Sequence, residues 1–81
     1  MDLVFDIETD DIAATVIHCI VCQDPESGEI FKFKPDQIAA GCKFLADADT
    51  LIGHNIVGFD IPVIKKLTGV DLSGKKIIDT L

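Results

Sequence analysis

The stretch LVFDIETD, residues 3–10, most restricts the fold, because acids interrupt an apolar run at every second position. Alternate residues of a β-strand point to the same face, so Asp6 and Glu8 would project side by side while Phe5 and Ile7 face the other way. Two close carboxylates in a partly buried site are unfavourable unless a cation or a proton neutralises them. The pattern predicts a core strand whose acids hold Mg²⁺ or Mn²⁺. The simpler alternative is an edge strand with solvated acids.

A second acidic motif follows in GHNIVGFDIP, residues 53–62. The glycines and the proline predict that a strand ends here in a turn, with Asp60 at or near the start of a helix. If that strand lies parallel to the first, the two C-terminal ends meet, and Asp60 can join Asp6 and Glu8 around one site. The alternative is that Asp60 is only a helix N-cap, a position that Asp favours.

Periodicity and turn residues predict one small domain with the element order β-β-β-α-β-α-β. Each strand-helix-strand crossover makes its two strands parallel, whereas the first three strands are expected to be antiparallel, so the sheet is mixed. Gly69 is expected to stop the second helix. The predicted strands are residues 3–7, 14–23, 30–34, 50–53 and 76–80, and the predicted helices begin at Pro35 and Phe59.

The last predicted strand has no helix after it. A mixed sheet needs cover on both faces. We therefore expect that the chain is truncated, or that a partner covers the exposed face, which could be a second copy in a homo-oligomer.

The two acidic motifs also carry a family resemblance. DIET (residues 6–9) and HNIVGFDIPVI (residues 54–64) resemble the first and second motifs of the DEDD 3′-to-5′ exonucleases, which have a ribonuclease-H-like fold. The likeness is closest to the N-terminal proofreading domain of bacteriophage family A DNA polymerases, and IIDTL (residues 77–81) resembles the strand that follows there. The resemblance implies an α/β ribonuclease-H-like mixed five-stranded sheet without its C-terminal helices. Residues 1–81 would be the N-terminal part of such an exonuclease domain, which hydrolyses phosphodiester bonds at DNA 3′ ends.

The resemblance further implies a two-metal site with Mg²⁺ or Mn²⁺. Asp6 would bridge both ions, Glu8 would bind one of them near the terminal 3′-hydroxyl, and Asp60 would hold the second, directly or through water. Two such ions can activate the attacking water and stabilise the leaving oxygen. The implied partners are the 3′ end of single-stranded DNA and the rest of a DNA polymerase chain.

Further residues receive roles by the same analogy. Thr9 would touch the terminal nucleotide, and Asn55 and Phe59 would shape the second motif and the strand groove. Phe59 is equally well explained as core packing. We interpret His54 as structural, satisfying a local hydrogen bond, and Asp79 as the cap of a helix that should follow.

The family's third motif, a Tyr or His followed by an Asp, does not occur in these residues, which contain no Tyr. That motif supplies the fourth acid and a group that orients or deprotonates water. We therefore expect this chain alone to bind metal weakly and to cut poorly or not at all.

The charge balance bears on the class of protein. Fourteen acids stand against seven lysines, with no arginine. This excess repels polyanions and argues against a basic nucleic-acid-binding module, although an enzyme whose acids hold cations is compatible with it.

The three cysteines, an odd number, and the lack of a signal peptide or membrane span favour the cytoplasm, which for a viral protein is that of the host cell. Cys19 and Cys22 lie three apart on a strand, so they face opposite sides and are expected to pack rather than bind zinc.

Two alternative functions follow from the same motifs. A haloacid-dehalogenase-type phosphatase also has an acid-x-acid strand end, but its second acid is normally Asp and not Glu. A non-catalytic ribonuclease-H-like module would keep the fold and serve as an interaction or structural domain.

Overall fold

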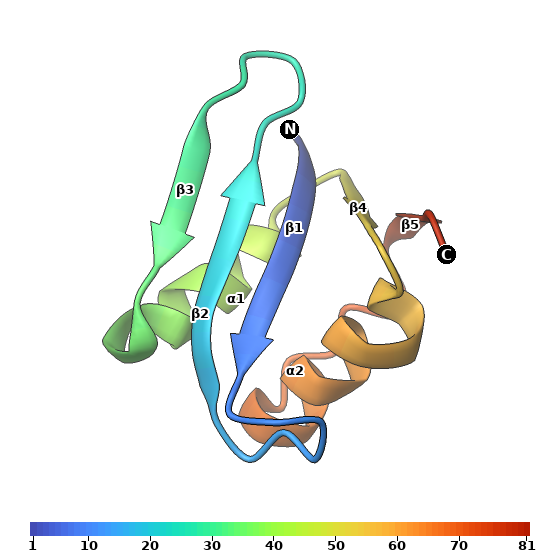
Figure 1. Cartoon of the computed structure of the whole chain (residues 1–81). Coiled ribbons are helices and arrows are strands. Elements are labelled where there is room, and N and C mark those ends of the chain that lie inside the picture. Colours follow the sequence, from blue (N-terminus) through green and yellow to red (C-terminus); the bar gives the residue numbers. More distant parts are fainter.

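Five strands and two α-helices make up the structure, a computed structural model that describes residues 1–81 (Figure 1). A 3₁₀ turn, η1 (Pro35–Gln37), precedes the first helix, and a π-helical turn, η2 (Ile56–Asp60), precedes the second. The predicted order β-β-β-α-β-α-β is confirmed. The elements are β1 (Asp2–Thr9), β2 (Ile17–Gln23), β3 (Ile30–Phe33), α1 (Ile38–Ala46), β4 (Thr50–Gly53), α2 (Ile61–Thr68) and β5 (Lys76–Asp79).

The strands form one mixed sheet, as predicted, and their order in the sheet is β3-β2-β1-β4-β5. β2 pairs antiparallel with β1 and β3, while β4 pairs parallel with β1 and β5. This α/β arrangement is compatible with a ribonuclease-H-like fold. The β1–β4 ladder ends at the pair Val4↔Ile52, whereas β1 continues to Thr9 along β2. The second half of β1 therefore has no strand partner on its β4 side.

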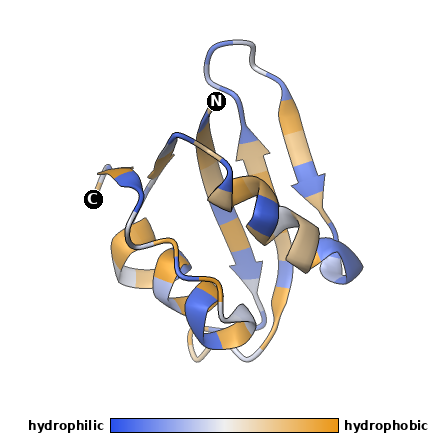
Figure 2. Cartoon of the chain, turned by 180° about the vertical axis from the view of Figure 1, so that it is seen from behind, coloured by the Kyte–Doolittle hydropathy of each residue, from blue (hydrophilic) through white to orange (hydrophobic).

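Both helices pack against the same face of the sheet. The view from behind shows them in front of the strands (Figure 2), and the Cys42 Sγ of α1 lies 3.9 Å from the Thr68 Oγ1 of α2. Gly69 ends α2 in the left-handed conformation, with φ of 81°, which confirms the predicted stop. Neither helix has the length and apolar character needed to cross a membrane. The core beneath the helices includes Leu3, Phe5, Ile7, Ile20, Cys42, Leu45, Leu51, Ile56 and Ile64.

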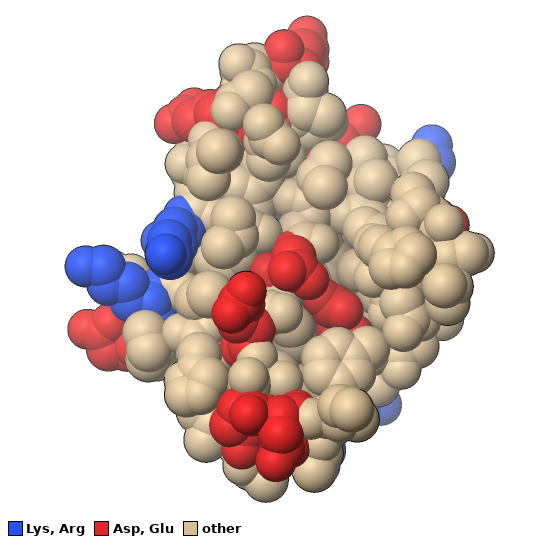
Figure 3. Space-filling model, in the orientation of Figure 1, with Lys and Arg blue, Asp and Glu red and all other residues tan.

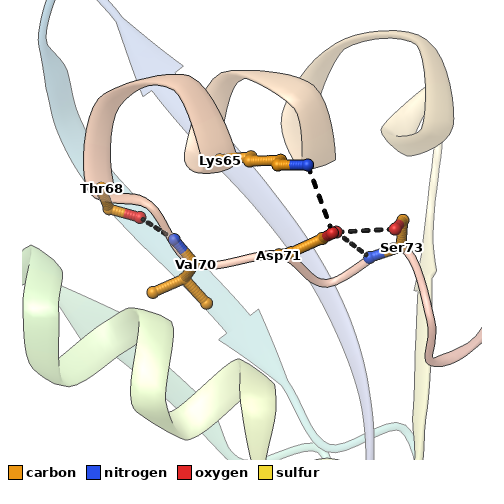
Figure 4. Close-up of polar contacts among 5 residues, drawn as sticks. All are labelled: Lys65, Thr68, Val70, Asp71 and Ser73. Carbon is orange, nitrogen blue, oxygen red and sulfur yellow. Dashed lines mark hydrogen bonds and ion pairs between the residues drawn. The ribbon is translucent and has the colours of Figure 1, made fainter.

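The opposite face of the sheet carries no helix. Its apolar side chains remain accessible, with Ile30 64% exposed on β3 and Ile78 48% exposed on β5. Acidic side chains gather in the middle of this view of the molecule, and lysines lie toward its edges (Figure 3). Coverage of this face by a partner or a second copy stays a prediction.

Several predicted boundaries differ from the structure. β2 begins at Ile17 and not at residue 14, because Ala14 has a φ of 53° and its N–H donates to Asp11 in a turn. β1 is longer than predicted, because β2 supports it as far as Thr9. The helix expected from Phe59 is divided between η2 and α2, and the helix expected from Pro35 between η1 and α1.

Candidate functional site

β1 presents two of the predicted site residues on the uncovered face. Asp6 pairs with Val21 and Glu8 pairs with Cys19 on β2, so both acids lie within the regular part of the antiparallel ladder. Both are exposed, whereas the intervening Ile7 is buried beneath the helices. The alternation in the sequence thus places these two carboxylates side by side on a supported strand.

Asp60 reaches the same strand from the turn between β4 and α2. Its side chain is buried, with 3% of the residue exposed, and its Oδ2 accepts a hydrogen bond of 3.1 Å from the Ile7 N–H. This N–H lies beyond the end of the β1–β4 ladder, so the carboxylate replaces the missing strand partner. Asp60 occupies the N-cap position of α2 but makes no side-chain bond there, so the alternative interpretation, in which Asp60 is only a helix cap, is wrong.

The surroundings of Asp60 disfavour its negative charge. Burial, above all, and then the nearby Asp6 and Asp79 carboxylates raise the pKa of Asp60 to about 6, although the Ile7 N–H acts in the opposite direction. Near pH 7 Asp60 is therefore a buried anion with a second acid close by. A cation at this position would relieve both the burial and the repulsion.

The donor chemistry fits a hard divalent cation, because all three candidate ligands are carboxylates. The structure brings Asp60 within electrostatic reach of Asp6, and Glu8 shares the strand face with Asp6. The three do not form a closed set, since no group of three or more His, Cys, Asp or Glu side chains is arranged to hold a metal ion. Asp6 and Glu8 are exposed, so their side chains are free to rotate toward Asp60.

Asn55 and Phe59, both predicted to contact substrate, make contacts that stabilise the turn. Asn55 adopts the left-handed conformation, with φ of 55°, which Asn tolerates better than most residues. Its carbonyl accepts the Phe59 N–H at 3.0 Å, and its side chain lies so close to Gly58 that a Cβ there would collide with it. Phe59 packs partly buried against the core, as the packing interpretation expects. Contact of either residue with DNA stays a prediction.

Asp79 contributes to the site in a way that the sequence did not reveal. Its Oδ1 accepts the Asn55 N–H at 2.8 Å, and its Oδ2 accepts the Val57 N–H at 2.9 Å. These and a further bond from the Leu81 N–H lower the pKa of Asp79. Both oxygens thus bind the turn before α2, and the Leu81 N–H adds a bond from the residues that follow β5, so the cap on a following helix stays a prediction. The parallel pairing of β4 and β5 could have indicated the bonds to the turn, since their C-terminal ends must meet.

The remaining polar candidates have local partners. The Thr9 hydroxyl donates to the Asp11 carbonyl at 2.9 Å, so its contact with a nucleotide stays a prediction. The His54 Nδ1 lies 3.3 Å from the Thr80 Oγ1, in agreement with a structural role. Cys22 is buried on the helix side while Cys19 is half-buried opposite Glu8, so the two cysteines point to different faces, as predicted.

No protein-family model and no curated protein matches the chain. A solved structure that it resembles is the family B DNA polymerase from the hyperthermophilic archaeon Pyrobaculum calidifontis, with a TM-score of 0.63 and 24% sequence identity. The match covers 93% of this chain and 12% of the polymerase. The similarity establishes the fold, which also occurs as a small part of that DNA polymerase.

Proposed function

We propose that residues 1–81 form the N-terminal part of a ribonuclease-H-like 3′-to-5′ exonuclease domain. The observation that carries this proposal is the hydrogen bond from the Ile7 N–H to the buried Asp60 carboxylate. Asp6 directly precedes Ile7 on β1, and its charge acts on Asp60. The structural similarity to a polymerase supports a DNA polymerase context. The resemblance of both motifs to phage family A enzymes supports a proofreading role at DNA 3′ ends.

In this proposal, Asp6, Glu8 and Asp60 would hold two Mg²⁺ or Mn²⁺ ions. Bound metal would supply an activated water and stabilisation of the leaving oxygen in phosphodiester hydrolysis. The residues themselves supply anionic ligands on a backbone that is fixed, because β2 pairs with β1 from Val4 onward. The Ile7 N–H orients one oxygen of Asp60, which leaves the other for a cation.

The charge of the chain limits how DNA could bind. A net charge of −7 repels the phosphate backbone, so the chain would not hold a single strand tightly without help. The rest of a polymerase would have to bring the 3′ end to the site. Thr9 would then touch the terminal nucleotide, and Asn55 and Phe59 would shape the groove for the strand.

The first test is the location of metal binding, which does not depend on activity. Substoichiometric Mn²⁺ broadens NMR signals near its binding site, and we expect broadening centred on Ile7 and on the carboxylates of Asp6, Glu8 and Asp60. Asp6→Asn should abolish this pattern, whereas Asp2→Asn should preserve it, because Asp2 is an exposed acid on the same face of β1. Broadening centred on other acids, or equal in both variants, would overturn the proposal.

The second test is cleavage of a 5′-labelled single-stranded DNA with Mg²⁺ or Mn²⁺. Shortening from the 3′ end that is lost in Asp6→Asn and kept in Asp2→Asn would support an exonuclease. Products of internal cleavage, or of shortening from the 5′ end, would contradict it. Specific Mn²⁺ binding without cleavage would support the metal site but count against catalysis by this chain alone.

A further inference from the structure

We propose that Asp79 is a positioning residue, which clamps the turn at residues 55–60 so that Asp60 reaches the edge of β1. The catalytic consequence rests on the exonuclease function proposed above, but the clamp itself does not. Asp79 belongs to β5, and its carboxylate touches neither β1 nor the three predicted ligands through any hydrogen bond. It would therefore act through Asp60 and not on a substrate.

The clamp begins where β4 and β5 end together. Gly53 and Asp79 form the last pair of this parallel ladder, and the Thr80 N–H donates to the Gly53 carbonyl at 2.9 Å. From this point the two Asp79 oxygens receive the Asn55 and Val57 N–H groups. These N–H groups lie at the start of η2, where no preceding helical turn supplies acceptors. One carboxylate thus ties the first residues of the turn to the edge strand of the sheet.

The turn then carries this constraint to Asp60. The Phe59 N–H bonds back to the Asn55 carbonyl at 3.0 Å, which closes the turn directly before Asp60. Ile56 is fully buried, and a Cβ on Gly53 would collide with its side chain, so the turn is packed tightly against the end of β4. Asp60 itself makes the bond to Ile7. A continuous set of contacts therefore links β5 to β1 through residues 53–60.

The partners of Asp79 favour a positioning role over simple surface capping. Both of its oxygens accept N–H groups of the turn, from Asn55 at 2.8 Å and from Val57 at 2.9 Å. Hydrogen bonds to a carboxylate are stronger than those between neutral groups. The bond from the Val57 N–H, with those from Leu81 and Asn55, lowers the pKa of Asp79.

Amide hydrogen exchange provides the test, because the Ile7 N–H reports on Asp60 and lies on a different strand from Asp79. In Asp79→Asn we expect exchange at least tenfold faster at Asn55, Val57 and Ile7, with the β1–β2 ladder at Asp6 and Val21 unchanged. Asp24→Asn is the matched control, because Asp24 also accepts a backbone N–H, from Glu26, but in the distant β2–β3 turn.

The outcomes separate a positioning role from a local one. Faster exchange at Asn55 and Val57 with unchanged protection at Ile7 would overturn the proposal, because Asp60 would then hold its place without the clamp. If Asp79→Asn unfolds the whole chain, native-state exchange of the unaltered protein in low denaturant decides instead. If the clamp exists, the Ile7, Asn55 and Val57 amides open together, so their opening free energies fall with denaturant at the same slope. Independent opening of Ile7 would overturn the proposal. None of these readouts depends on nuclease activity, so failure of the proposed function would be seen separately.

Discussion

The two sources of carboxylates in the candidate site differ in how the protein holds them. β1 pairs with β2 in a regular register from Val4 to Glu8, and its acids point away from the core. The turn from Asn55 to Asp60 combines a left-handed residue, a π-helical segment and a buried acid. The strand positions acids through a local repeat, whereas the turn positions its acid only through contacts from distant elements.

This difference predicts where the site is robust and where it is fragile. Strand acids can be replaced without changing the backbone, because they make no structural hydrogen bonds in the sheet. The turn depends on close packing at Gly53, on the carboxylate of Asp79 and on the bond from Asp60 to Ile7. Substitutions in the turn should therefore have the larger effects on stability.

The largest effect is expected for Gly53→Ala. A Cβ at this position would collide with Ile56 and lie 2.9 Å from the Phe5 carbonyl oxygen, and neither the buried side chain nor the backbone can easily move. Overpacking of this kind should lower the free energy of unfolding by about 3 kcal/mol. Urea denaturation would measure the loss. Gly74→Ala is the control, because a Cβ there meets nothing within 4 Å, and equal losses in both variants would contradict the packing argument.

A second, opposite effect is expected for Asp60→Asn without metal. The amide oxygen can still accept the Ile7 N–H, but the unfavourable buried charge is removed. The native pKa of about 6 compared with an ordinary 3.8 corresponds to about 3 kcal/mol at neutral pH. Burial of the new amide hydrogens should offset part of this. We therefore expect a gain of about 2 kcal/mol at pH 7, measured by urea denaturation in the presence of EDTA.

The pH dependence of the free energy of unfolding tests whether ionisation of Asp60 causes this gain. Between pH 3.8 and about 6 the native state binds more protons than the unfolded state, so Asp60 makes the protein less stable as pH rises through this window. The variant lacks this decline, and the two stability curves should approach each other below about pH 4. A constant difference from pH 3 to pH 7 would show that the effect comes from packing and not from ionisation.

The sequence predicted the strand half of the site better than the turn half, for a physical reason. Alternation in residues 3–10 is a local pattern, and it correctly placed Asp6 and Glu8 opposite Phe5 and Ile7. The position of Asp60 near β1 also followed, because parallel strands bring their C-terminal ends together.

The contacts of the turn did not follow from any local pattern. The bond from Asp79 to Asn55 joins residues 24 positions apart, and the bond from Ile7 to Asp60 joins residues 53 positions apart. A π-helical turn has no periodic signature in five residues, so one helix from Phe59 was predicted in place of η2 and α2. Such details depend on which distant groups satisfy the backbone, and only the folded chain determines that.

The smallest effect is expected for Asp6→Asn in EDTA, which probes the strand half directly. Asp6 is exposed, so its removal should change the free energy of unfolding by only a few tenths of a kcal/mol. Its charge is nevertheless one cause of the raised pKa of Asp60, so the Asp60 carboxyl should titrate at lower pH in this variant, although still above its ordinary range because burial is the larger cause. Carbon-13 NMR of the carboxyl group measures this shift. Asp2→Asn, four residues earlier on the same strand face, should leave the titration of Asp60 unchanged. An equal shift in both variants would mean that the pKa of Asp60 depends only on the total charge of the sheet. That result would contradict the placement of Asp6 and Asp60 in one site.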